Sequence, residues 1–540
     1  MPRKAEACEQ KKLFGGALIL MPATVFSKIV GLFYKIPLIA IVGVEGMAYF
    51  LAAYHVYSLL FVLSATGLPT ALSLQVARSV AAGKPGAVGR VFAVALCLFL
   101  TLGLGGTALL FFCAPTLAAR LAMADAAASL YAIAPALLLA AFIGAAKGYF
   151  QGLGHMLPTA LSEVLEAMGK LLFGLLFALW AKKQGMPVPI VAAYAIFGIT
   201  AGLALAALLL TVLLLIYRIR QGRLAKGALP RRRAVLAQLL RVAVPVTLSA
   251  SVMSLVTLID TALISGRLQK AGFAPAVAHA MYSSYGNLAV PLYNLIPSLL
   301  TPLTLAMMPL LSAALTRGER EEGKAVLASA LRVTALFSVP AALGLGVFSE
   351  PILQLIYGGQ QEAIALSTPL LTLLALSVLP AALITLTGSA LQAAGRTATP
   401  VVAMLCGALM KLGVEYLLLP LPQLHIYAAP ISTLACNITV LIIQAIVLAR
   451  ALPFGFFSGK ELFCTLLGAV LSVGGGGALY FGLRGAGLQS RWLMLPVLAL
   501  VVSLFLLLAL LLGAVRREDL AALPAGERLA RFLQKHKLIK

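Results

Sequence analysis

Apolar runs of roughly twenty residues or more recur along the whole of this 540-residue chain. As a helix, each run is long enough to cross the ~30 Å hydrocarbon core of a bilayer. Helices are the expected spanning element, because lipid offers no hydrogen-bond partners to open backbone groups. Only 11% of the residues are charged and 61% are hydrophobic, which does not suit a water-soluble fold. The sequence therefore predicts an all-α integral membrane protein of about fourteen transmembrane helices.

The distribution of Lys and Arg gives the predicted orientation. Basic residues concentrate in alternate loops, and a large group lies between Arg218 and Arg233. Because cytoplasmic loops carry the positive excess, both termini are expected in the cytoplasm, and Lys147, near the end of a predicted span, is counted on the cytoplasmic side. The net charge of +24 then requires no nucleic-acid partner. The predicted spans cover residues 14–42, 47–79, 89–113, 126–150, 158–181, 188–217, 235–266, 281–314, 325–349, 366–394, 398–420, 426–450, 461–484 and 491–514.

An internal repeat indicates two lobes. Gln151-Gly-Leu-Gly precedes Lys170 by the same spacing with which Gln392-Ala-Ala-Gly precedes Lys411. Both copies run in the same direction, so a pseudo-twofold axis along the membrane normal is expected. The predicted parts are a six-helix lobe (1–217), a basic cytoplasmic linker (218–234), a second six-helix lobe (235–450), two extra helices (451–515) and a basic cytoplasmic tail (516–540). The tail is expected either to lie on membrane lipids or to be solvated.

Charged residues inside membrane spans are functional candidates, because an ion in hydrocarbon is costly. The first span carries Lys28 and Lys35, which share one helical face with Thr24 and Gly31. Two cations on one face predict a water-lined cavity or an anionic ligand, so these four residues are the predicted substrate-binding face. For Lys35, snorkelling toward the membrane interface is the alternative.

The fifth and eleventh spans carry both signs of charge. Glu163, Glu166 and Lys170 lie on the fifth span, and Lys411 and Glu415 lie on the eleventh. The pairs Glu166–Lys170 and Lys411–Glu415 have the i,i+4 spacing of helical ion pairs. These residues either form a charge network that couples transport to an ion, or neutralise each other and fix the packing of the lobes.

Polar residues also mark the seventh and eighth spans. Asp260 is the only acid of the seventh span and is the predicted site for a coupling cation or proton. Asn287 and Asn294 lie seven residues apart on the eighth span, so a regular helix places both on one substrate-binding face. Prolines interrupt this helix and free carbonyl groups that can line a cavity. Interhelical hydrogen bonding is the alternative.

The sequence also argues against several functions. It contains no GxxxxGK[ST] motif, so the chain does not hydrolyse nucleotide by itself. It has no CxxC motif and no histidine cluster, so no metal site is expected. We therefore expect a transporter and not an enzyme, without a cofactor, coupled to protons, sodium or the membrane potential.

Three motifs carry a resemblance to a known family. They are Ser27-Lys-Ile-Val-Gly-Leu-Phe-Tyr-Lys-Ile-Pro37, Gly67-Leu-Pro69, and Gly148-Tyr-Phe-Gln-Gly152 with Pro158-Thr159. Together with the two-lobe plan they resemble the multidrug/oligosaccharidyl-lipid/polysaccharide (MOP) exporter superfamily. Within it, the chain is similar over nearly its whole length to polysaccharide biosynthesis proteins related to stage V sporulation protein B.

This resemblance implies an alternating-access flippase in a bacterial plasma membrane. Its substrate would be an undecaprenyl-diphosphate-linked sugar, either peptidoglycan lipid II or a polysaccharide unit, moved from the inner to the outer leaflet. It would serve cell-wall, spore-cortex or polysaccharide synthesis as a monomer, with cell-wall synthesis enzymes as partners. The related lipid II flippase has two cavity-facing arginines in its first helix; Lys28 matches the first, and Lys35 lies one residue beyond the second. A cation-coupled multidrug (MATE-like) antiporter is the alternative, which Asp260 and Glu163 keep open.

Overall fold

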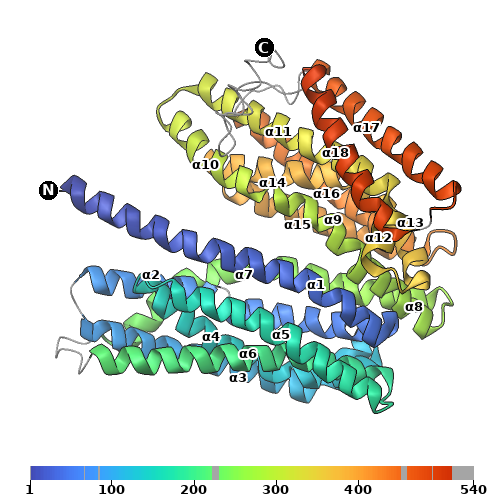
Figure 1. Ribbon diagram of the computed structural model, residues 1–540. Helices are drawn as coiled ribbons and strands as arrows, with labels where there is room; N and C mark the ends of the chain where they lie inside the picture. The colour runs from blue at the N-terminus through green and yellow to red at the C-terminus, as the bar shows by residue number, and fades with distance from the viewer. Residues whose placement is uncertain are drawn as a thin grey trace. The chain divides into compact units, whose positions relative to one another are not determined.

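The computed structural model describes residues 2–65, 67–82, 85–221, 230–451, 459–488 and 490–513. The side chains of residues 2–21 and of several later residues, Lys28 among them, lie outside this description. Within the described ranges every regular element is a helix, so the predicted all-α class is confirmed (Figure 1). The chain forms two compact units, residues 1–269 with 273–283 and residues 270–272 with 284–540.

The first unit contains eight α-helices and one short 3-10 helix among the described residues. They are α1 (Pro2–Ala65), α2 (Gly67–Ala81), α3 (Pro85–Arg120), η1 (Ala124–Ala126), α4 (Ala127–Gly152), α5 (Leu157–Lys183), α6 (Val188–Gln221), α7 (Arg232–Lys270) and α8 (Pro275–Ser283). The long α1 is broken at Gly43, whose backbone (φ 82°, ψ 168°) is accessible mainly to glycine. The division between α1 and α2 falls at the Gly-Leu-Pro motif.

The second unit begins with a helix that is interrupted several times. Its elements are η2 (Ser284–Ala289, a π-helical turn), α9 (Val290–Leu299), α10 (Thr301–Thr316), α11 (Arg320–Val347), α12 (Ser349–Tyr357), α13 (Gln361–Ala375), α14 (Val378–Ala393), α15 (Ala398–Leu418), η3 (His425–Tyr427), α16 (Ala428–Ala451), α17 (Gly459–Gly485), η4 (Arg491–Leu493) and α18 (Met494–Leu511). Pro291 and Pro302 stand in the first turns of α9 and α10, where the missing N–H costs no helical hydrogen bond.

Eleven helices among the described residues are long and apolar enough to cross a membrane, or twelve if the bent pair α13–α14 is one span. The fourteen predicted spans differ from these twelve in two places. Residues Pro22–Val80 form one 59-residue stretch that contains the second predicted span and most of the first. The predicted eighth span, 281–314, is divided among α8, η2, α9 and α10, so no single piece of it is long enough. The membrane-spanning class is confirmed, and the number fourteen stays a prediction.

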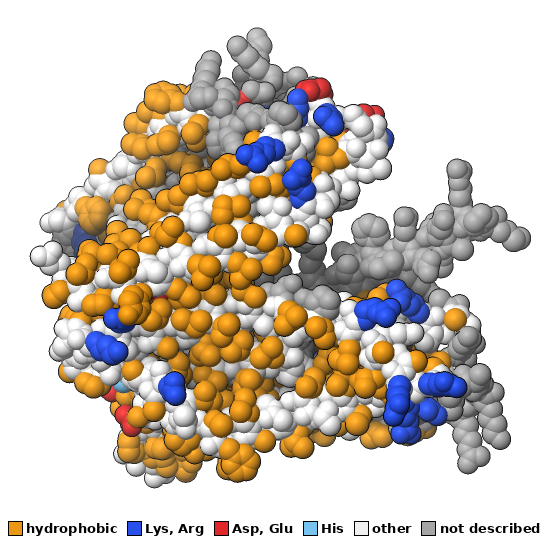
Figure 2. Space-filling view, turned by 180° about the vertical axis from the view of Figure 1, so that it is seen from behind, with side chains coloured by type: hydrophobic (Ala, Val, Ile, Leu, Met, Phe, Trp, Pro, Cys, Tyr) orange, Lys and Arg blue, Asp and Glu red, His pale blue; other side chains and the backbone are white. Residues whose placement is uncertain are grey.

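The outer surface of the helices is apolar. Phe112, Leu409 and Leu417 are 80%, 72% and 69% exposed. On the face shown in Figure 2, hydrophobic side chains run along the helices, and Lys and Arg gather toward the helix ends. A surface of this kind would associate in water, whereas in a bilayer its apolar part faces lipid and its basic part lies at the interface.

Glycine brings α5 and α6 into backbone contact. A Cβ atom added at Gly169 would lie 2.7 Å from the Cα atom of Gly202, and one added at Gly198 would collide with Gly174. Figure 1 shows the two helices running side by side. Small residues on facing helices are the usual means of close packing in membranes, where no hydrophobic effect drives helices together.

The Gly-Leu-Pro motif and the motif that begins at Gly148 meet in the first unit. A Cβ atom at Gly148 would lie 2.7 Å from the carbonyl oxygen of Pro69, and one at Gly152 would lie 2.6 Å from the Cβ atom of Val76. The glycines therefore allow α4 to approach α2 closely. Packing alone accounts for the small residues of this motif.

The compact units and the predicted lobes divide the chain at different places. α7 and α8 belong to the first unit, whereas the internal repeat assigned residues 235–283 to the second lobe. The two-lobe division stays a prediction.

In the second unit, α17 and α18 pack against α11 through a cluster that includes Val339, Ala469 and Phe505. Residues 222–229 of the predicted linker and all of the predicted tail lie outside the described residues.

Candidate functional site

Charged side chains from α4 and α5 meet inside the first unit. Lys147 Nζ lies 3.9 Å from Glu163 Oε1 and 3.9 Å from Glu166 Oε2. These three side chains are 17%, 28% and 38% exposed, so water reaches them only in part. Glu163 and Glu166 are one turn apart on α5, which allows a single ammonium group to serve both carboxylates. With Lys170 one further turn along α5, we call these four residues the charged cluster.

The polar face of α1 lies against this cluster. Thr24 Oγ1 donates a hydrogen bond to Glu163 Oε2 at 3.1 Å, and Ser27 Oγ donates to the Glu163 carbonyl oxygen at 3.2 Å. A Cβ atom added at Gly31 would meet no other atom within 4 Å, so the space beside this residue is open. Two residues of the predicted substrate-binding face, Thr24 and Gly31, therefore do border a cavity with the acids of α5.

Lys170 is held by aromatic rings. Its Nζ lies 5.3 Å from the ring centroid of Tyr34 and 5.7 Å from that of Tyr54. An ammonium group over an aromatic face is attracted by the ring quadrupole. The ion pair of Glu166 is formed with Lys147 and not with Lys170, although the two residues of α5 have the i,i+4 spacing. Lys35 is half-buried and close enough to Lys170 for the two positive charges to repel each other.

Two cavities flank the charged cluster. One has a volume of about 380 Å³ and is lined by the second half of α1, α2, α4, α5 and α6; Lys147, Gln151 and Tyr57 contribute polar atoms to it. The other, of about 320 Å³, lies between the first half of α1 and α5. Glu166 and Lys170 line both cavities. These two residues of the charged cluster thus form the wall that the two cavities share, while Lys147 faces the first cavity and Glu163 the second.

The charged residues that line the two cavities are balanced among the described residues. Lys147 and Lys170 oppose Glu163 and Glu166. Lys35 is not among the lining residues, but it lies close enough to Lys170 to add a positive charge beside the cavities. Lys28 belongs to α1, but its side chain lies outside the described residues, so its predicted role is untested. A positive charge beside a partly enclosed and otherwise balanced site favours an anionic ligand.

Sequence reasoning did not bring Lys147 into the candidate site. It counted Lys147 only among the basic residues of the cytoplasmic side, whereas the structure shows that the residue lies within α4 and that its ammonium group pairs with two glutamates of α5. The signal was present in the sequence, since Lys147 falls inside the predicted span 126–150. A lysine near the end of a span can point into the bundle, and the predicted orientation is unaffected by this.

A second charged pair lies in the second unit. Lys411 Nζ is 3.2 Å from Glu415 Oε1, so the predicted ion pair between these residues is formed. Ser432 Oγ on α16 donates a hydrogen bond to the same carboxylate oxygen at 2.7 Å. Glu415 is fully buried and Lys411 is 14% exposed. The contacts join α15 to α16, as expected for a packing element; a transport role stays a prediction.

Asp260 is half-buried on α7, beside a polar contact that the sequence did not reveal. His55 Nδ1 lies 2.8 Å from Thr261 Oγ1, and the hydroxyl of Tyr282 donates to Thr261 Oγ1 at 3.0 Å. These residues join α1, α7 and α8 within the first unit. His55 and Tyr282 are isolated polar residues far apart in the sequence, so no spacing pattern could have paired them. The coupling role of Asp260 stays a prediction.

The two asparagines of the predicted eighth span do not form a common stripe. Asn287 is fully buried in the π-helical turn η2, whereas Asn294 on α9 is exposed. The expectation assumed an uninterrupted α-helix. A π turn adds a residue per turn and the breaks shift the register further, so a spacing of seven residues no longer corresponds to one face. A substrate-binding role for either residue stays a prediction.

Known structures share this helical architecture. The chain superimposes with a TM-score of 0.66 on a lipid II flippase MurJ in an inward closed conformation, at 17% identity, covering 91% of this chain and 98% of that one. It also superimposes with a TM-score of 0.64 on an inward-facing multidrug resistance MATE family transporter of the MOP superfamily, at 16% identity, covering 79% of this chain and 95% of that one. These likenesses define the fold as that of MOP-superfamily membrane transporters.

The family follows from the sequence match. A family model described as lipid II flippase MurJ matches residues 84–502, and the chain belongs to this family. Stage V sporulation protein B from Bacillus subtilis (strain 168) is 25% identical over 527 residues, covering 95% of this chain and 98% of that protein. Lipid II flippase MurJ from the same organism is 24% identical over 431 residues, covering 76% and 78%. The predicted MOP-superfamily flippase for a lipid-linked precursor is confirmed, and the family is one of transporters.

Proposed function

We propose that this protein moves an undecaprenyl-diphosphate-linked sugar from the inner to the outer leaflet of a bacterial plasma membrane by alternating access. Lipid II and a polysaccharide unit are the two proposed forms of the substrate. The observation that carries the proposal is the pair of ammonium groups, Lys147 and Lys170, that line the cavities of the first unit, with Lys35 close to Lys170. The named activity of the MurJ relative supports lipid II, and the name of the sporulation relative supports a role in sporulation.

The physical problem for such a substrate is its diphosphate. Moving an ion from water into a medium of low dielectric constant costs on the order of 20 kcal/mol before relaxation. Fixed ammonium groups in a wet cavity offset this cost. Lys147 is suited to this task, because its two carboxylate contacts of 3.9 Å are longer than the ~2.8 Å of a close charge-assisted hydrogen bond. It can turn to a phosphate oxygen without breaking a strong contact.

The remaining cations complete the proposed anion site. The ammonium group of Lys170 lies over two aromatic rings and is attracted by Glu166 without a close ion pair to it, so an anion can still approach it. Lys28 is proposed to contact the diphosphate, and Lys35 to hold a second anionic group or guide entry. The open space beside Gly31 leaves room for a head group. Lysine provides a point charge and not the planar fork of arginine, so selection would rest on charge and cavity shape.

Depletion in cells tests the direction of transport. In a strain without a redundant flippase, loss of this protein should trap the diphosphate-linked sugar in the inner leaflet. Leaflet-resolved labelling of the precursor measures this, and identification of the accumulated glycan distinguishes lipid II from a polysaccharide unit. Normal outward exposure of every lipid-linked sugar would contradict the proposal.

A cation-coupled antiporter is the second candidate. It is favoured by Glu163 and Glu166, which place two acids at the cavity walls, and by the fold shared with a MATE transporter. Proteoliposomes separate the two functions. An antiporter would exchange a cationic dye for protons or sodium, whereas the proposed flippase should expose a fluorescent diphosphate-linked lipid in the opposite leaflet without moving the dye.

A further inference from the structure

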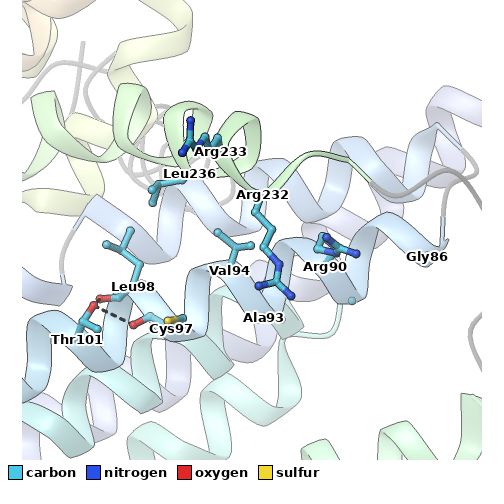
Figure 3. Close-up of a pocket in the computed structure, with 11 residues that line it drawn as sticks. Gly86, Arg90, Ala93, Val94, Cys97, Leu98, Thr101, Arg232, Arg233 and Leu236 are labelled. Atoms are coloured by element: carbon cyan, nitrogen blue, oxygen red, sulfur yellow. Dashed lines mark hydrogen bonds between the residues drawn. The ribbon is translucent and has the colours of Figure 1, made fainter.

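A separate basic pocket lies where α3 and α7 begin (Figure 3). Its volume is about 740 Å³, and it shares no lining residue with the two cavities of the charged cluster. Arg90, Arg232 and Arg233 line it, and none of its described lining residues is acidic. Figure 3 shows the Arg232 side chain reaching from α7 to the face of α3 that carries Ala93 and Arg90, whereas Arg233 points away from α3.

The rest of the pocket is a narrow apolar track along α3. Its lining residues recur every three or four positions, which places them on one helical face: Gly86, Gly89, Arg90, Ala93, Val94, Cys97, Leu98 and Thr101. From Arg90 to Thr101 this face is about 16 Å long at a rise of ~1.5 Å per residue. The Thr101 hydroxyl already donates to the carbonyl oxygens of Cys97 and Leu98, at 2.9 and 2.8 Å, so the far end of the track offers no free donor.

We infer that this pocket binds an anionic phospholipid of the surrounding membrane. Its phosphate lies between the guanidinium groups of Arg90 and Arg232, and one acyl chain lies along the track from Ala93 to Thr101. Guanidinium groups bind phosphate oxygens in pairs of parallel hydrogen bonds, and two adjacent arginines repel each other unless an anion separates them. A free phosphate would occupy the arginine end only and leave the apolar track empty.

The orientation of the unit is consistent with this ligand. α3 and α7 both begin at ends that the distribution of Lys and Arg assigns to the cytoplasm, and the cytoplasmic leaflet is the anionic one. A zwitterionic phospholipid is a weaker fit, because its ammonium group would meet the arginines. The bound lipid would fill the space between α3 and the first turns of α7 and so hold the two helices together.

Binding to the purified full-length protein tests the inference. The probes are phosphatidylglycerol, phosphatidylcholine, glycerol 3-phosphate and undecaprenyl diphosphate, and retained lipid is counted by native mass spectrometry. The variant Arg90→Gln/Arg232→Gln should bind phosphatidylglycerol about thirtyfold more weakly, since each basic residue near an anionic lipid contributes roughly one kcal/mol. The control Arg78→Gln/Arg241→Gln removes the same charge from exposed positions of α2 and α7 outside the pocket and should leave binding unchanged.

Further variants separate charge from shape. Arg90→Lys/Arg232→Lys should retain most phosphatidylglycerol, which also shows that the glutamine pair did not fail simply by misfolding. Ala93→Leu fills the track and keeps both arginines, so it should weaken phosphatidylglycerol and leave glycerol 3-phosphate unaffected. Three results would overturn the inference: equal competition by glycerol 3-phosphate, which indicates a free-anion site; preferential displacement by undecaprenyl diphosphate, which indicates a substrate site; or unchanged binding in the glutamine pair.

Discussion

Replacement of Lys147 is the most direct test of the charged cluster. Two unit charges 3.9 Å apart attract each other by about 4 kcal/mol at an effective dielectric constant of 20. Partial exposure and the cost of desolvation reduce the net value to roughly 1–2 kcal/mol for each pair. Lys147→Ala removes both pairs and leaves Glu163 and Glu166 facing each other. It also removes the proposed phosphate contact, worth roughly 1.5–3 kcal/mol, so transport should fall about 10- to 100-fold.

The assay is outward movement of a fluorescent diphosphate-linked lipid in proteoliposomes, with reconstituted protein quantified. Lys147→Arg should retain activity because it keeps the charge. Lys324→Ala is the matched control, since it also breaks a lysine–glutamate pair, here of 2.6 Å with Glu321, outside the two cavities. Its transport should equal that of the unchanged protein.

A charge exchange distinguishes transport from packing. Lys147→Glu/Glu166→Lys restores an ion pair between α4 and α5 but moves the positive charge to another helix. If Lys147 acts on the substrate, the exchanged protein should fold normally and transport poorly. Full transport activity of the exchanged protein, or of Lys147→Glu alone at normal abundance, would refute a role of Lys147 in binding the substrate.

Three other predictions concern residues whose roles the structure leaves untested. Lys28→Arg should complement a flippase-depleted strain, whereas Lys28→Ala and Lys28→Glu should fail at normal membrane abundance and Lys35→Ala should be milder; an active Lys28→Glu would remove the phosphate role. Asp260→Asn should abolish the dependence of vesicle transport on the ion or proton gradient, and an unchanged dependence would leave Asp260 a structural residue. Glu415→Ala should lower stability by about 3–5 kcal/mol because it removes a fully buried carboxylate from its 3.2 Å contact with the Lys411 ammonium group. The double variant Lys411→Met/Glu415→Leu should recover that stability, as measured by thermal unfolding. If the double variant is stable but still does not transport, the pair has a role in transport beyond packing.

Hydropathy predicted the fold well because a membrane-spanning helix can be recognised from the apolar residues of a single continuous segment. The Lys411–Glu415 pair is likewise local, and the structure contains it. The charged cluster was only partly predictable, since Thr24 and Glu163 lie 139 residues apart and nothing in their periodicity shows that α1 faces α5. The asparagine stripe failed for a different reason, because a π turn changes the period on which the prediction depended.

The glycine contact between α5 and α6 constrains the path of an isoprenoid tail. Such a tail must stay in hydrocarbon while its head group crosses, so it needs a slot between helices. Two helices whose backbones touch at Gly174 and Gly198 leave no slot between them. The edge of α1 offers a different path on the first unit, because the space at Gly31 is open and the helix is broken at Gly43. Bulky side chains placed along that edge should obstruct long-chain substrates before short-chain ones.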